Sequence, residues 1–292
     1  MPCHLIDLKF QDCEQVIAAY VVPHTQGAFL VEPGPYVCFE HLTRALANLN
    51  VSPQDITDVF VTHVHFDHAG AAWALAEAGA RIHVHPLGLP HLADPTRLWS
   101  SASRIYGEHN MLALWGEMRP IAEDQLKAWD HEQQETLHSC EVTALATPGH
   151  AKHHHTWCID QYQFWGDVGG VRIGSGPVEP PCPPPDIDLE AWFDSIDLLM
   201  NRYANQSCFI THFGQVNDPQ WHLRELASAL RDWSAFAKTL HVEGTPQAAS
   251  LFEEFVDDRR GRSADGYQLA NPASMSYPGL ARYWKRSLAS EA

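Results

Sequence analysis

The segment VTHVHFDHAG at residues 61–70 constrains the fold of this chain more than any other feature. It places three histidines and one aspartate, all of them common metal-ligand types, within the six residues from His63 to His68. A strand-like apolar run precedes the segment, and an alanine-rich helical run follows it. On such a strand-to-helix turn, His63 and His65 can point to one side, while Asp67 and His68 turn toward a neighbouring position. The segment therefore predicts a loop that can hold two metal ions.

Three later strand-like runs end in residues of the same types. One run leads through Thr-Pro-Gly to His150, another leads through Gly166 to Asp167, and a third leads through Thr211 to His212. In a layered α/β fold, strand ends on one edge meet at a crevice, where side chains from separate strands can bind one ligand. We therefore expect these three side chains to lie beside the first motif.

Charge and cysteine content argue against several classes of protein. Among 292 residues, 36 are acidic and 19 are Lys or Arg, which gives a net charge of −17 and would repel a phosphate backbone. We therefore expect no nucleic-acid partner. The seven cysteines form no CxxC pair, which argues against a disulfide framework or a thiolate zinc site. Because no run of 18 apolar residues and no signal-peptide pattern occurs, we expect no membrane partner and a cytoplasmic location.

The order of helical and strand-like runs predicts an α/β catalytic domain over residues 1–215, beginning with an antiparallel meander. A helical, tryptophan-containing stretch at 87–133 interrupts the alternation, and we interpret it as an inserted lid. Residues 216–292 show helical spacing throughout, which predicts a helical C-terminal extension rather than a second sheet.

The order HxHxDH, TPGH, GD and THFG resembles the metallo-β-lactamase-fold hydrolase superfamily, particularly its glyoxalase II-like and lactonase-like branches. The resemblance covers about residues 16–215 and implies a four-layer αββα sandwich. It also implies two divalent metal ions, most often zinc, although iron or manganese occurs in some members. By matching position, it assigns His63, His65 and His150 to one ion, Asp67, His68 and His212 to the other, and Asp167 to a bridging position.

The chain departs from the family pattern at Glu32, and two ligand positions separate it from particular branches. The strand that commonly ends in Asp-Thr-Gly ends here in Glu32-Pro33-Gly34, which leaves the role of this carboxylate open. Asp167 stands where the commonest zinc β-lactamases carry cysteine, which counts against antibiotic hydrolysis. His65 stands where the di-iron redox branch typically carries glutamate, which favours hydrolysis over oxygen reduction.

The ligand set predicts a metal-dependent hydrolase that cleaves a small ester, lactone or thioester. Two ions held about 3.5–4 Å apart would lower the pKa of a bridging water and so supply hydroxide to attack a carbonyl carbon. Asp67 would be both a ligand and a catalytic proton shuttle. Two alternatives remain: a mononuclear iron oxidoreductase of the sulfur dioxygenase kind, and a metal-stabilised binding module without activity.

Further residues are candidates for contacts around the metals. In the insertion, Tyr106 either donates a hydrogen bond to an oxyanion or packs as an apolar residue. Arg172 either binds a substrate carboxylate or forms a surface ion pair. His154 is a candidate for supporting the ligands from behind. We expect a small-molecule substrate. The C-terminal helices resemble tails that in relatives cover the site or mediate dimers, so a homodimer and core packing are both open.

Overall fold

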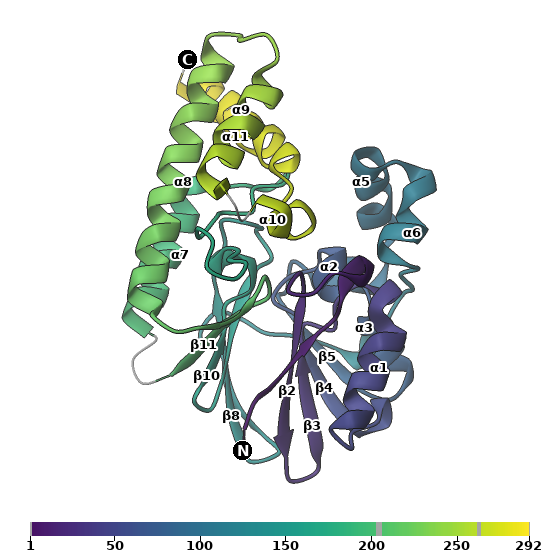
Figure 1. Cartoon of the computed structure of the whole chain (residues 1–292). Helices are drawn as coiled ribbons and strands as arrows, with labels where there is room; N and C mark the ends of the chain where they lie inside the picture. The colour runs from purple at the N-terminus through teal and green to yellow at the C-terminus, as the bar shows by residue number, and fades with distance from the viewer. Residues whose placement is uncertain (1, 203–205, 262–263, 292) are drawn as a thin grey trace.

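Two six-stranded sheets pack face to face between two layers of helices in the computed structural model, which describes residues 2–202, 206–261 and 264–291 (Figure 1). The first sheet contains, in spatial order, β1 (His4–Asp7), β2 (Ala18–His24), β3 (Gly27–Val31), β4 (Ile56–Phe60), β5 (Arg81–Val84) and β6 (Leu126–Ala128). The second contains β12 (Gly214–Val216), β11 (Ser207–Ile210), β10 (Tyr162–Phe164), β9 (His155–Ile159), β8 (Cys140–Ala146) and β7 (Gln134–Leu137). The predicted αββα sandwich is confirmed.

Both sheets are mixed. The strands from β1 to β3 pair in antiparallel fashion, which confirms the predicted meander, and those from β3 to β6 pair in parallel. In the second sheet, β10 and β11 pair in parallel, while the remaining pairs are antiparallel. Parallel strands end at the same edge of a sheet, so this topology places the loops after β4 and β10 where a site can form.

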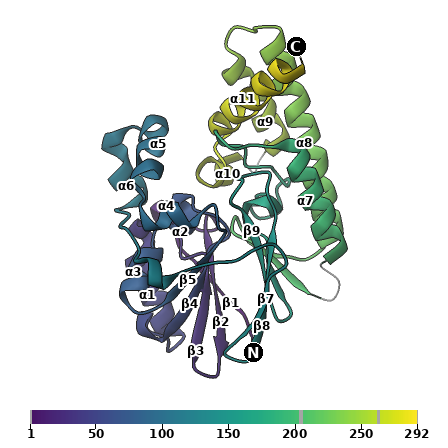
Figure 2. The same cartoon turned by 180° about the vertical axis from the view of Figure 1, so that it is seen from behind.

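Helices cover the outer face of each sheet (Figures 1 and 2). On the first sheet lie α1 (Phe39–Asn48) and α3 (Ala72–Glu77), preceded by the one-turn helix α2 (Phe66–Ala69). On the second sheet lie α7 (Leu189–Arg202) and α8 (Pro219–Val242). Helix α7 buries Leu189, Trp192, Ile196 and Leu199, the three-to-four-residue spacing of one helix face.

The core has one layer between the sheets and one layer under each set of helices. Aromatic side chains fill the space between the sheets: Phe29 packs edge-on against Phe60, and Phe60 packs edge-on against Trp157. All three are completely buried. Because this layer fixes one sheet against the other, it also fixes the strand ends that carry the candidate ligands.

The insertion contains α4 (Leu89–Ala93), α5 (Thr96–Tyr106) and α6 (Met111–Trp115). Helical structure was predicted as far as residue 133, but Leu126–Ala128 form strand β6, which pairs in parallel with β5. This short strand buries Leu126 and pairs with the backbone hydrogen-bonding groups of β5, which a helix could not do. The helical part of the insertion is therefore shorter than predicted.

The C-terminal extension consists of α8 followed by α9 (Ala248–Arg260), α10 (Ala264–Ala270) and α11 (Ala273–Glu291). Trp233 of α8, Phe252 of α9 and Leu280 of α11 are buried together with side chains of α7 and β11. These helices therefore share a core with the second sheet, and a homodimer formed through them stays a prediction. Among the described residues, no helix is both long enough and apolar enough to cross a bilayer.

One buried histidine joins the C-terminal extension to the loop that carries Asp167. The imidazole Nε2 of His222, in α8, lies 2.8 Å from the carbonyl oxygen of Gly169 and donates to it. Burial lowers the pKa of His222 to about 4. The unfolded chain therefore takes up a proton near pH 6.5 that the folded chain does not take up until about pH 4.

Because of His222, we expect the free energy of unfolding to be about 3 kcal/mol lower at pH 4 than at pH 6.5. The variant His222→Gln can donate to the same carbonyl and does not titrate. Urea unfolding of both proteins at several pH values tests this: stability of the wild type should fall more steeply on acidification. Parallel curves would contradict the prediction.

Candidate metal centre

The seven predicted ligands lie at one edge of the two sheets. The loop between β4 and α2 carries His63 and His65, and α2 itself carries Asp67 and His68. The opposing sheet supplies the rest from the ends of β8, β10 and β11: His150, Asp167 and His212. The tight turn before His150 requires glycine, because Gly149 has φ +140° and a Cβ there would lie 2.4 Å from the Cα of Trp192.

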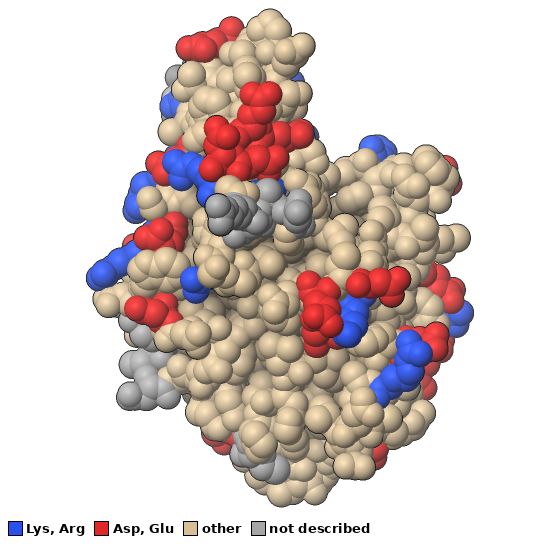
Figure 3. Space-filling model, in the orientation of Figure 1, with Lys and Arg blue, Asp and Glu red and all other residues tan. Residues whose placement is uncertain are grey.

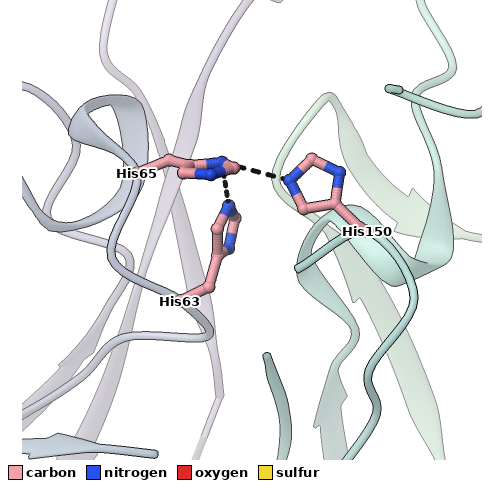
Figure 4. A group of neighbouring side chains, drawn as sticks. All are labelled: His63, His65 and His150. Carbon is pink, nitrogen blue, oxygen red and sulfur yellow. Dashed lines mark hydrogen bonds between the residues drawn. The ribbon is translucent and has the colours of Figure 1, made fainter. Parts of the chain in front are cut away.

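Three imidazole nitrogens converge at the first half of the centre (Figure 4). The Nδ1 atom of His65 lies 2.9 Å from Nε2 of His63 and 3.1 Å from Nε2 of His150. Three nitrogens bound to one zinc ion at about 2.0–2.1 Å and tetrahedral angles would lie about 3.3 Å apart. The trio therefore has nearly the spacing that one metal ion requires.

Backbone carbonyls orient the rings of His150 and His212. Nδ1 of His150 lies 2.8 Å from the carbonyl oxygen of Pro181, and Nδ1 of His212 lies 2.6 Å from that of Val16. Because a carbonyl can only accept, each Nδ1 carries the hydrogen, and in the neutral ring Nε2 is left with its lone pair. Backbone carbonyls thus fix the tautomers that metal binding needs.

The second half of the centre joins two histidines to two carboxylates. Oδ2 of Asp67 lies 3.5 Å from Nε2 of both His68 and His212. Oδ1 of Asp167 lies 3.3 Å from Nε2 of His68 and 3.5 Å from that of His212. The other carboxylate oxygen of Asp167, Oδ2, lies 3.3 Å from Nε2 of His150. Asp167 therefore faces both halves.

Two of these atoms are buried without a hydrogen bond: Nε2 of His68 and Oδ1 of Asp167. Leaving a buried polar group unpaired costs about 1–3 kcal/mol, and more when the group is charged. A cation between these atoms would satisfy both. The donor set, five imidazoles and two carboxylates, is the type that zinc, iron and manganese accept.

The surroundings shift the pKa values of the two halves in opposite directions. Burial lowers the pKa of His63 and His150, and it lowers that of His65 to about 3, so the first three rings are neutral. Burial acts in the same direction on His68, but the carboxylates of Asp167, Asp67 and Glu32 raise its pKa well above the usual value. Metal binding at the second half must therefore displace a proton.

Glu32 supports His68 from behind. This buried carboxylate accepts hydrogen bonds from the backbone nitrogen of Thr62 at 2.7 Å and from Oγ1 of Thr211 at 3.0 Å, and it contacts Nδ1 of His68. It thereby connects two ligand-bearing segments, the one from Thr62 to His68 and the one at the end of β11, and it holds the His68 ring with Nε2 toward the centre. The sequence left the role of Glu32 open, because the family pattern commonly has aspartate at this position. The structure shows that the glutamate side chain, which is longer than that of aspartate, reaches the ring of His68.

We expect Glu32→Gln to weaken metal affinity about 10–100-fold, because the amide leaves His68 without its charged partner. Competition with a fluorescent chelator measures this affinity directly. The control is Glu40→Gln, in which a solvent-exposed glutamate of α1 loses its charge. Equal affinities of the wild type and both variants would contradict the supporting role.

The other candidate residues lie in different surroundings. Tyr106 lines a cavity that also includes His65, Asp67, His150 and Asp167. Arg172 does not line it: its guanidinium lies 4.6 Å from the ring centre of Trp221, and its Nε donates to the carbonyl of Gly176.

His154 accepts a hydrogen bond from the backbone nitrogen of Val168, next to Asp167. It therefore steadies the loop of Asp167, and its ring also stacks on the ring of His63, with the two ring centres 5.1 Å apart. Sequence reasoning missed the carbonyls of Val16 and Pro181, because a backbone oxygen leaves no signal in residue identity.

Comparison with known proteins places the chain in a family. The sequence model described as the metallo-beta-lactamase superfamily matches residues 14–199. The chain belongs to the metallo-β-lactamase superfamily. The metallo-beta-lactamase fold-containing protein ST1585 of Sulfurisphaera tokodaii is 25% identical over 238 residues, which cover 78% of this chain and 86% of that protein.

Two solved structures agree with the fold. The crystal structure of ST1585 from Sulfolobus tokodaii, an archaeal superfamily protein, matches with a TM-score of 0.68 at 19% identity, covering 95% of this chain and 97% of that one. A second neighbour, TTHA1623 in a di-iron-bound form, matches with a TM-score of 0.54 at 23% identity, covering 72% of this chain and 93% of that one.

Proposed function

We propose that this member of the metallo-β-lactamase superfamily is a dinuclear metal hydrolase that cleaves a small ester, lactone or thioester. The observation that carries the proposal is the position of Asp167, whose two oxygens face His150 on one side and His68 and His212 on the other. One carboxylate between two sets of imidazoles is the arrangement that holds two ions close together. His63, His65 and His150 would hold one ion, and Asp67, His68 and His212 the other.

The bound ions would lower the pKa of a shared water to near neutrality and polarise the substrate carbonyl. The remaining tasks belong to the chain. Asp67 is the most accessible of the four residues of the second half, with 24% of its side chain exposed, and it lines the cavity. Although burial opposes it, the charge of His68 holds the pKa of Asp67 well below its usual value, so this carboxylate is ionised before a metal binds. Its position on the cavity floor is what supports the proton-shuttle role that we propose for it.

Tyr106 fits the task of an oxyanion donor. Burial raises the pKa of its hydroxyl and the nearby carboxylate of Asp67 raises it further, so the phenol stays protonated throughout the neutral range. A hydrogen-bond donor aimed at a developing negative charge contributes about 10²–10³-fold to such reactions. Tyr106 is therefore our candidate for stabilising the substrate oxygen. Arg172 is not a candidate, because its guanidinium stacks on the Trp221 ring and it does not line the cavity.

Metal content and a substrate panel test the proposed function together. We expect two metal ions per chain by plasma emission, and turnover of at least one uncharged ester or lactone that disappears on chelation. Tyr106→Phe should lower kcat/KM by about 10²-fold without changing the metal content. A metal-loaded protein that hydrolyses no ester, lactone or thioester would contradict the proposal.

The same preparations identify the metal and test the alternative chemistry. Zinc is our expectation, and the di-iron form of one structural neighbour makes iron the competing outcome. One iron per chain, together with oxygen consumption in the presence of glutathione persulfide, would favour the sulfur dioxygenase alternative. Two ions and no oxygen consumption would favour the hydrolase.

A further inference from the structure

A cavity of about 240 Å³ lies directly over the candidate metal centre. Its walls come from four parts of the chain. The N-terminal segment supplies Phe10, the insertion supplies Ile105 and Trp115, the proline-rich loop supplies Pro183, and helices α10 and α11 supply Leu269 and Met275. The floor consists of the metal-ligand residues His65, Asp67, His150 and Asp167.

The walls of this cavity carry no cation. Of the described residues that line it, none is Lys or Arg, and the charged ones are Asp67 and Asp167 of the metal centre. In Figure 3, most of the surface in the notch between the insertion and the C-terminal helices is uncharged, while acidic side chains gather on the C-terminal helices beside it. A substrate with a carboxylate or phosphate beyond the reacting bond would therefore lose hydration without gaining a cationic partner from the described lining residues, whose polar members other than the two aspartates, such as Gln11 and Gln268, are neutral.

The size of the cavity limits what it can enclose. Ligand pockets more often measure about 300–1,000 Å³, so this cavity is smaller than most of them. A short acyl group, with its ester at the metal centre, suits such a space.

We infer that the substrate is an uncharged ester or lactone with a short aliphatic acyl group, enclosed between the insertion and the C-terminal helices. This inference rests on the proposed hydrolase function and narrows it. It excludes glutathione thioesters, whose two carboxylates would find no cation among the wall residues. It also gives the C-terminal extension a role in selecting the substrate.

A matched pair of substrates tests the charge preference. Methyl hexanoate and monomethyl adipate have acyl chains of six carbons, and the second ends in a carboxylate. We expect kcat/KM, measured by acid release with the metal-loaded enzyme, to be at least 100-fold higher for methyl hexanoate. Equal turnover of the two esters, or faster turnover of the adipate, would overturn the inference while leaving the hydrolase function in place.

Two variants of the insertion provide the matched comparison. Ile105 lines the cavity and is 40% exposed, whereas Leu112 lies outside it and is 63% exposed, so both positions tolerate lysine. Ile105→Lys should lower the ratio of kcat/KM for methyl hexanoate to that for monomethyl adipate at least tenfold, because the lysine ammonium group can pair with the adipate carboxylate. Leu112→Lys should leave the preference unchanged. Leu269→Lys repeats the test from the opposite wall.

Binding measured without turnover separates the two proposals. Calorimetric titration with hexanamide, which mimics the acyl group and is not hydrolysed as an ester, should give at least tenfold weaker binding to Ile105→Lys than to the wild type or Leu112→Lys. If no ester is hydrolysed but this difference appears, the hydrolase proposal fails and the apolar binding site stands. If hexanamide binds all three proteins alike, or none, the inference is overturned.

Discussion

We expect Asp167→Asn to lower hydrolytic turnover by at least about 10³-fold while leaving the chain folded. The amide has the shape of the carboxylate but lacks its charge, and Asp167 is the residue whose oxygens face His150, His68 and His212. Removing that charge should lower the metal content from two ions to one. Metal-ion catalysis contributes several kcal/mol to such reactions, and each 1.36 kcal/mol corresponds to a factor of ten in rate.

Turnover, metal content and circular dichroism measured on the same sample test this prediction. The control is Asp197→Asn, which removes a charge from an exposed position of α7 and should behave like the wild type. A folded Asp167→Asn enzyme with two ions and undiminished turnover would show that Asp167 is not a metal ligand.

The second large effect is expected at Arg260, whose guanidinium is buried in α9. Its Nε and Nη2 donate to the two carboxylate oxygens of Glu179 at 2.8 and 2.7 Å, and Nη2 also donates to the carbonyl of Asn271 at 2.6 Å. Both side chains of the pair are almost completely buried. Arg260→Leu leaves the Glu179 carboxylate without its partner, which should cost about 3–5 kcal/mol of unfolding free energy.

We expect this loss to lower the melting temperature of the variant by roughly 10 °C. The neighbouring Arg259 provides the control, because it pairs with Asp232 at 2.9 Å on the surface, with both side chains more than 40% exposed. Arg259→Leu should cost less than about 1 kcal/mol. Equal losses in the two variants would show that burial of the pair is irrelevant to stability.

The Arg260 pair also connects the C-terminal helices to the candidate site. The backbone of Glu179 exchanges hydrogen bonds with that of Val171, and Val171 forms a bridge with His212. Asn271, whose side chain donates to Glu179, lines the cavity over the metals. Loss of Arg260 should therefore disturb the cavity wall as well as stability.

The layered fold and the candidate metal donors could be predicted from the residue pattern alone. Strand runs of buried apolar residues have a period that residue identities record, and HxHxDH places four ligand types on one short turn. Glycine at 149 likewise signals a turn that other residues cannot form, which points to His150. Each of these features depends on residues that are close together in the sequence, so each can be predicted without knowing the fold.

Contacts between distant segments could be seen only in the folded structure. It placed Glu32 behind His68, gave His150 and His212 their carbonyl partners, moved residues 126–128 from a helix into the sheet, and placed Tyr106 but not Arg172 at the cavity. Such contacts join residues up to 196 positions apart, as between His212 and Val16. They depend on how the two sheets pack, because packing brings together side chains and backbone groups whose proximity no local pattern encodes.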